Sequence, residues 1–219
     1  MGFAHLGDLS PSPSTSWAIS IALALDRKIM EEVKGGPTPE YYGEYERANT
    51  TLNDIAEKAA QFLLSRGHQA QALPATWTAL EREREEGSTL RADFQHKTAA
   101  TRAGLGSIGK SALLITPLYG PRVRLTTVLT ELPLPAGKPI TEGRCGSCHL
   151  CVDACPTRAI KGRNWRAGMA REELVDARAC YLEARRLLRE RVEVDHPVCG
   201  VCVAVCPWTR REKGGEVLA

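Results

Sequence analysis

The chain has 219 residues, of which 43% are hydrophobic and 25% charged, and its formal net charge is +3 at pH 7. Such a composition is typical of a globular protein, and so small a charge argues against nucleic-acid binding. The apolar run at 17–25 is too short to span a membrane, and the first residues lack the basic segment of a secretory leader. We therefore expect a cytoplasmic protein that does not insert into a membrane.

The first part of the chain alternates strand and helix patterns. Alternating apolar residues predict a strand at 17–26, and the tyrosine-rich segment 35–49 is expected to form a loop. Apolar residues at helical spacing over 52–63 predict a helix that ends at Gly67. The run 68–75 indicates a short strand.

Further elements follow in the same manner. The mixed charges of 81–86 are typical of a solvated helix, and 89–104 indicates a loop that leads into a short helix. Residues 111–117 and 122–132 are rich in β-forming residues and are separated by a turn. A helical insertion is predicted at 171–192.

All eight cysteines lie in the last part of the chain, and the first 144 residues contain none. The first run has the spacing C-x2-C-x2-C-x3-C-P, which is that of bacterial ferredoxins, and consists of Cys145, Cys148, Cys151 and Cys155. The second run, C-x2-C-x3-C-P, lacks a first member and consists of Cys199, Cys202 and Cys206. Cys180 is the one cysteine left to complete it.

This spacing predicts two 4Fe-4S clusters, because the fourth cysteine of such a run binds the other cluster in two-cluster ferredoxins. One ligand set would be Cys145, Cys148, Cys151 and Cys206. The other would be Cys155, Cys180, Cys199 and Cys202. The alternative is zinc, since paired C-x2-C motifs also form four-cysteine zinc sites, although zinc does not explain two C-x3-C-P endings.

The stretch 104–111 (GLGSIGKS) fits both the P-loop and the dinucleotide-binding motif. A P-loop needs a strand before it and a helix that begins at its lysine. Here a polar, helix-like segment precedes Lys110 and a strand-like segment follows, so we expect no nucleotide binding. The glycines then serve a tight turn, or they let the backbone approach a large ligand closely.

The residues at 96–134, followed by the first cysteine run, resemble epoxyqueuosine reductases and reductive dehalogenases. The segment CGVCVAVCPW at 199–208 resembles the second cluster motif of the epoxyqueuosine reductases. In those families a nitroreductase-like α/β domain holds cobalamin and a ferredoxin-like module supplies electrons. The resemblance implies an α/β (α+β) fold with a reduced nitroreductase-like domain at 1–140 and a two-cluster bacterial ferredoxin-like module at 141–219. It also implies a short version of these enzymes, without the C-terminal helical-repeat domain.

The same resemblance implies that the glycine block lies near a corrinoid. The expected contact residues are Gly104, Leu105, Gly106, Gly109, Lys110, Tyr119 and Gly120. The alternative is that these glycines only allow close packing beside the cluster module.

No catalytic residue is assigned. Epoxyqueuosine reductases carry an acidic proton donor upstream of the glycine block, but the corresponding stretch here, 72–83, has no Asp or Glu before Thr78. The candidate substitutes, each with an ordinary packing role as its alternative, are Asp93, His96, Tyr41, Tyr42 and Tyr45.

Together these features predict an iron-sulfur oxidoreductase in which two clusters relay single electrons to a cobalamin or a substrate site. The alternative is a non-enzymatic electron-transfer protein, or a reductive activator of a corrinoid or flavin partner. The expected partners are a reduced ferredoxin or flavodoxin-type donor and a corrinoid or corrinoid protein. A tRNA substrate is not expected, because the net charge is small.

Overall fold

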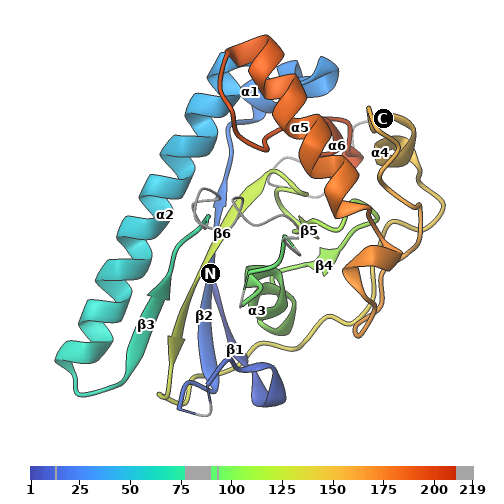
Figure 1. The fold of residues 1–219 in the computed structure, drawn as a ribbon. Helices are drawn as coiled ribbons and strands as arrows, with labels where there is room; N and C mark the ends of the chain where they lie inside the picture. Colours follow the sequence, from blue (N-terminus) through green and yellow to red (C-terminus); the bar gives the residue numbers. More distant parts are fainter. Residues whose placement is uncertain (13, 77–89, 93, 211–219) are drawn as a thin grey trace. The chain divides into compact units, whose positions relative to one another are not determined.

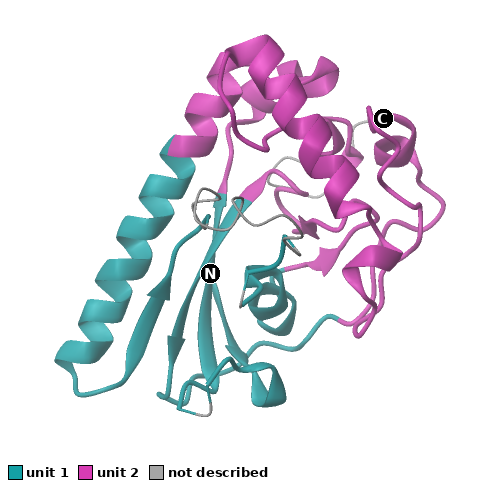
Figure 2. Cartoon of the chain, in the orientation of Figure 1, with its two compact units in different colours: residues 1–23, 47–105, 124–140 teal, residues 24–46, 106–123, 141–219 magenta. Residues whose placement is uncertain are grey.

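A computed structural model describes the chain except for residues 13, 77–89, 93 and 211–219. The described residues form two compact units (Figure 2). Unit 1 comprises 1–23, 47–105 and 124–140, and unit 2 comprises 24–46, 106–123 and 141–219. One unit boundary lies between Ile140 and Thr141, where the cluster module was expected to begin. The assignment of two domains, 1–140 and 141–219, stays a prediction.

Unit 1 is built on a four-stranded sheet (Figure 1). In sheet order its strands are β1 (Gly2–His5), β2 (Trp17–Ala24), β6 (Val123–Thr130) and β3 (Ala70–Leu73). The two outer strands pair antiparallel with their neighbours, with Phe3 opposite Ile19 and Ala72 opposite Val128. The strands predicted at 17–26, 68–75 and 122–132 are therefore confirmed, whereas β1 was not predicted.

Helices cover both faces of this sheet. Side chains alternate along a strand, so neighbouring residues of β6 point to opposite faces. Val128 packs against Ala56, Ala60 and Leu63 of α2 (Pro39–Ser65). Leu129 belongs instead to a core cluster that includes residues of and beside α3 (His96–Arg102), the short helix predicted within 89–104. The result is a mixed layered fold of helix and sheet, as predicted, while its nitroreductase-like character stays a prediction.

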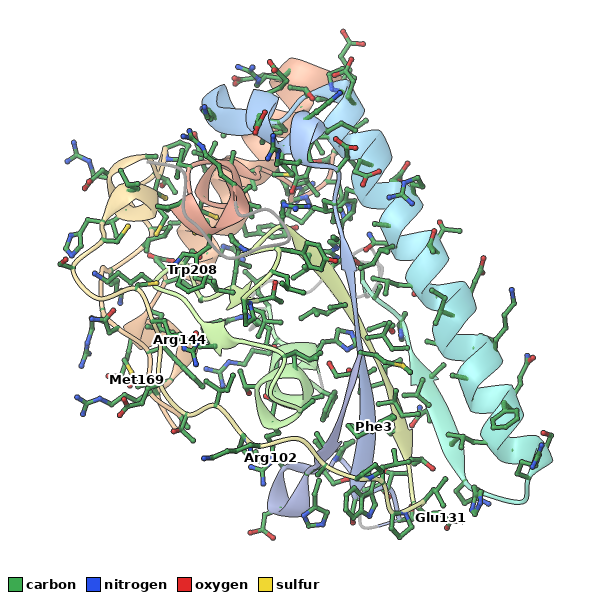
Figure 3. All side chains as sticks on the ribbon, turned by 180° about the vertical axis from the view of Figure 1, so that it is seen from behind. Phe3, Arg102, Glu131, Arg144, Met169 and Trp208 are labelled. Atoms are coloured by element: carbon green, nitrogen blue, oxygen red, sulfur yellow. The ribbon has the colours of Figure 1, made fainter. Side chains whose placement is uncertain are left out.

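Hydrogen bonds fix the connections around this sheet. Arg102 Nε donates to the carbonyl oxygen of His5 at 2.8 Å, which joins the end of α3 to β1. The carbonyl oxygen of Phe3 accepts from Gly137 N at 2.9 Å, and Glu131 accepts from Gln69 N at 3.1 Å. Figure 3 labels Phe3, Arg102 and Glu131.

The prediction that 35–49 forms a loop is wrong, because α2 already begins at Pro39. Thr38 Oγ1 accepts from Tyr41 N at 3.2 Å, and proline is well suited to a first helical position. Tyr41, Tyr45 and Leu52 are buried at helical spacing, so the apolar stripe starts earlier than Leu52. The predicted end is confirmed, since α2 stops at Ser65, shortly before Gly67.

Unit 2 consists of short elements and one longer helix. Its strands β4 (Ser107–Ile108) and β5 (Leu114–Ile115) form a small hairpin. Its helices and 3-10 turns are α1 (Arg27–Glu31), η2 (Glu32–Gly35), α4 (Leu150–Asp153), η4 (Arg171–Glu173), α5 (Ala177–Val192), α6 (Val201–Ala204) and η5 (Pro207–Arg210). A further turn, η1 (Gly7–Leu9), belongs to unit 1.

The helical insertion predicted at 171–192 is confirmed as η4 and α5. The helix α5 begins after Asp176, whose side chain accepts from Ala179 N at 2.9 Å and caps it. It ends at Glu193, which adopts a left-handed conformation with φ of 61°. The solvated helix predicted at 81–86 lies outside the described residues. Within the described ranges, no helix combines the length and the apolar character needed to cross a bilayer.

Candidate metal centre

The two cysteine runs fold into equivalent short motifs in unit 2. In the first, Cys151 lies on α4 and Cys155 lies just beyond its end, with Cys155 N donating to Val152 O at 3.3 Å. In the second, Cys202 lies on α6, and Cys206 N donates in the same way to Val203 O at 3.3 Å. In both runs the helix therefore ends before the last cysteine. Contacts join α4 and α6 to each other.

Four thiols form a first group, because they lie close enough to act on one another's pKa values. Burial, together with the neighbouring Cys145, Cys151 and Cys148, raises the pKa of Cys206 to about 12. Burial likewise raises the pKa of Cys151 to about 11, with Cys145 and Cys148 adding to the effect. The members of this group, called set A below, are Cys145, Cys148, Cys151 and Cys206.

The other four thiols form a second group. The residue Cys180 is exposed, but the surrounding protein partly desolvates its thiol, and this effect together with Cys199, Cys155 and Asp176 raises its pKa to about 11. The pKa of Cys202 is raised well above its usual range, first by burial and then by Cys199, Cys180, Cys151 and Cys155. The members of this group, called set B below, are Cys155, Cys180, Cys199 and Cys202. Since Cys151 acts on Cys202, the two sets adjoin.

Sets A and B have the same members as the two ligand sets inferred from the spacing. Each set combines cysteines from distant segments: Cys206 joins the first run, while Cys155 and Cys180 join the second. The assignment of individual thiolates to individual clusters stays a prediction, which is developed under the proposed function.

The donor chemistry fits iron-sulfur clusters. Thiols whose pKa values are raised by burial and by each other form thiolates when positive metal ions compensate the charge. Among the described residues, no three His, Cys, Asp or Glu side chains converge tightly enough to hold one metal ion. A 4Fe-4S cluster has a different requirement, because each of its four thiolates binds its own iron.

The glycine block lies between α3 and β5, with β4 inside it. Helix before and strand after is the order that the sequence predicts, and it is the reverse of a P-loop. A Cβ on Gly106 would overlap the carbonyl oxygen of Ile115, and a Cβ on Gly109 would overlap the Ile115 side chain. The same Cβ on Gly109 would lie 3.4 Å from Cys145 Sγ. These two glycines thus permit tight packing of the β4–β5 hairpin beside set A.

The other residues expected near a corrinoid are placed as follows. Gly104 and Leu105 belong to unit 1, where a Cβ on Gly104 would lie 2.9 Å from Lys138 O and Leu105 packs against the core. Gly120 belongs to unit 2, has φ of 55°, and packs against the backbone of Trp208, which Figure 3 labels. Tyr119 is half-buried, with the Arg122 guanidinium 5.2 Å from its ring centre.

Lys110, also part of the glycine block, differs from the glycines because it brings a charged side chain into the interior. It is only 2% exposed, and its charge lowers the pKa of Cys151, opposing burial and the neighbouring cysteines. The sequence placed Lys110 near a corrinoid but gave no sign that its charge would act on a cluster cysteine, because nothing local predicts this burial.

The structure describes four of the five candidate proton donors. His96 Nδ1 lies 2.9 Å from Thr127 Oγ1 and Nε2 lies 3.0 Å from Pro74 O, and burial lowers its pKa. Burial and a hydrogen bond to Glu46 raise the pKa of Tyr42 to about 12. The remaining described candidates, Tyr41 and Tyr45, are buried. Asp93 lies outside the described residues.

The sequence analysis did not single out His196, which is the partner of Tyr45. The Tyr45 hydroxyl lies 3.2 Å from His196 Nε2. No local pattern marks His196, because the two residues are far apart in the sequence.

Residues 144–209 match the protein family described as the 4Fe-4S double cluster binding domain. This range contains all eight cysteines and favours iron-sulfur clusters over zinc. The two 4Fe-4S clusters predicted from the spacing are therefore confirmed as the cofactors of this domain.

Curated relatives extend the likeness beyond the cysteine region. The epoxyqueuosine reductase of Vibrio cholerae is 34% identical over 131 residues, which is 54% of this chain and 32% of that enzyme. The tetrachloroethene reductive dehalogenase of Desulfitobacterium hafniense is 36% identical over 120 residues, or 52% of this chain and 22% of that enzyme. The chain thus matches about a third or less of the length of these relatives.

A solved reductive dehalogenase, described as suggesting a mechanism for B12-dependent dehalogenation, has a similar fold. The TM-score is 0.68 over 98% of this chain and 30% of that chain, at 20% identity. At this identity the likeness concerns the fold alone. The resemblance found in the sequence is confirmed: the chain carries a 4Fe-4S double cluster binding domain and is homologous, over about half its length, to epoxyqueuosine reductases and reductive dehalogenases.

Proposed function

We propose that the chain is an iron-sulfur oxidoreductase in which two 4Fe-4S clusters relay single electrons to a cobalamin or a substrate site. The observation that carries this proposal is the pair of adjoining four-thiol sets within a double cluster binding domain. The homologous regions of epoxyqueuosine reductases and reductive dehalogenases support the same class of reaction.

In this proposal set A and set B each hold one cluster, and a bound cluster takes up and releases one electron at a time. Electrons would have a short path between the two clusters, because Cys151 of set A and Cys202 of set B are electrostatic neighbours. Cys148 of set A and Cys180 of set B are exposed, so each set reaches the protein surface. An external donor could therefore approach either set.

The natural partners follow from the same chemistry. A reduced ferredoxin or flavodoxin-type protein is the proposed donor, and a corrinoid or corrinoid protein is the proposed acceptor. Cobalamin is supported by the solved dehalogenase, whose dehalogenation is described as B12-dependent. The proposed location is cytoplasmic.

A second function, that of an electron carrier or a reductive activator, is favoured by one observation. Gly106, Gly109 and Gly120 are each in close contact with residues of the chain itself, which accounts for these glycines without a ligand. A carrier needs exposed cluster edges and no enclosed substrate site.

Anaerobic purification and analysis test the proposal. We expect about eight irons and about eight sulfides per chain, from two cubanes of four. Titration of the dithionite-reduced protein with cobalamin should then change the absorption spectrum of the cobalt centre in step with cluster oxidation. Two full clusters without corrinoid binding would favour the carrier, and a protein that binds zinc alone would contradict both functions.

A further inference from the structure

Lys110 carries a charge into the interior of unit 2. With 2% exposure it is among the largest fully buried side chains of the described residues. Within the described part of the chain, Lys110 forms no salt bridge with a carboxylate. A buried ammonium group is costly unless negative charge lies close to it.

The backbone around Lys110 lies directly against set A. The preceding residue, Gly109, approaches Cys145 so closely that its Cβ would lie 3.4 Å from the Sγ atom. A Cβ on Gly143 would lie 2.8 Å from Ile108 O, so the segment that leads into Cys145 packs on β4. The charge of Lys110 also acts on Cys151, a second member of set A.

The charges beside set B have the opposite sign. Asp176 acts on Cys180, and Glu183 acts on Cys199. Glu183 is paired with Arg186 at 2.7 Å, which offsets part of its charge. Asp176 caps α5 and lies one turn before Cys180, whose N donates to Asp176 O at 3.1 Å. The two thiol sets therefore differ in the charge beside them, which is positive at set A and negative at set B.

We propose that the ammonium group of Lys110 supplies the counter-charge for the cluster held by set A and thereby raises the reduction potential of that cluster above the potential of the set B cluster. The proposal rests on the proposed ligand sets. Reduction adds one electron and one negative charge to the cluster, with no bond formed or broken. A nearby positive charge stabilises the reduced state more than the oxidised state, and net charge and hydrogen bonds to sulfur are known to set cluster potentials.

The test is a redox titration of the anaerobically purified full chain, followed by electron paramagnetic resonance. Lys110→Met removes the charge and keeps the length of the side chain, while Lys110→Arg keeps the charge. Lys161→Met is the matched control, because Lys161 is an exposed lysine of the same unit. We expect Lys110→Met to lower one of the two midpoint potentials by at least about 59 mV, a tenfold change in the ratio of reduced to oxidised cluster.

The second potential should stay unchanged in Lys110→Met, and both potentials should stay near their original values in Lys110→Arg and Lys161→Met. Full iron content with two unchanged potentials in Lys110→Met would overturn the proposal. So would an equal shift of both potentials, because that would indicate a general change in the fold.

A second measurement does not depend on the folding of Lys110→Met. Cys180→Ala removes a ligand of set B and should leave the set A cluster, whose potential is then measured alone. We expect this potential to correspond to the higher of the two wild-type values, and the lower value would overturn the proposal. A wild-type chain without two 4Fe-4S clusters would instead contradict the proposed function.

Discussion

Gly109 and Cys145 lie so close that a methyl group on the glycine would be 3.4 Å from the cysteine sulfur. The same methyl group would overlap the side chain of Ile115 in β5. The hairpin and the first cysteine run are therefore packed with no room for a side chain at this position.

The first prediction follows from this contact. Gly109→Val should displace the hairpin from Cys145 and accelerate the loss of the set A cluster, because the backbone cannot move away from both neighbours at once. The absorbance lost during anaerobic incubation with an iron chelator measures this rate, and we expect an increase of severalfold. Gly43→Ala is the matched control, because no heavy atom lies within 4 Å of the position of that Cβ. Equal rates in both variants would contradict the prediction.

The second prediction concerns Cys180, which is far from both compact runs in sequence. Cys180→Ala should remove the set B cluster selectively, lowering the iron content from about eight to about four per chain. Iron analysis and the loss of one of two resonance signals provide the measurement. Full iron content in the variant would show that another residue completes set B.

The third prediction concerns the pH dependence of stability. Burial, together with the charge of Arg124, lowers the pKa of His96 below its usual 6.5, while the hydrogen bond to Pro74 opposes the shift. As the pH falls below 6.5, the unfolded chain therefore takes up a proton that the folded chain resists, and the free energy of unfolding decreases.

The free energy of unfolding begins to decrease near pH 6.5 and continues to decrease down to the lowered pKa of His96. The slope is at most about 1.4 kcal/mol per pH unit for one proton. His96→Gln should show a smaller dependence over this window. Urea unfolding of the anaerobic protein, followed by circular dichroism between pH 8 and pH 5.5, compares the two slopes. Parallel curves would contradict the assignment to His96.

The fourth prediction concerns Arg122, which is 9% exposed. Its Nε donates to Thr209 O at 3.0 Å, and its Nη1 donates to Leu25 O at 2.8 Å. Arg122→Met should leave both carbonyl oxygens without these donors and reduce stability by roughly 2–4 kcal/mol. Arg27→Met is a suitable control, since the Arg27 side chain is 37% exposed. A loss in Arg122→Met no larger than in this control would refute the prediction.

The sequence predicted best where a single local pattern decides the structure. Cysteine spacing grouped the thiols into the two sets that are electrostatic neighbours in the structure, and alternation of apolar residues marked β2 and β6. It failed at 35–49, where a tyrosine-rich loop was expected although Tyr41 and Tyr45 already belong to the buried stripe of α2. A tyrosine can bury its ring in the core, so the apolar period of α2 extends across both tyrosines.

Other features depend on residues that are distant in the chain, and local patterns do not contain them. The burial of Lys110 arises from how the hairpin packs within unit 2, and the contact between Tyr45 and His196 joins segments far apart in sequence. For the same reason the glycine motif suggested a ligand, although the nearest neighbours of Gly106 and Gly109 belong to Ile115.

The exchange of cysteines between the two runs has a consequence for biosynthesis. With the ligand sets proposed above, the set A cluster needs Cys206 as well as the first run, so it cannot be completed until the second run has also left the ribosome. Deleting the second run would leave set A with three thiolates and set B with two. The two cysteine runs are therefore inseparable, and neither run can be kept alone as a smaller, one-cluster protein.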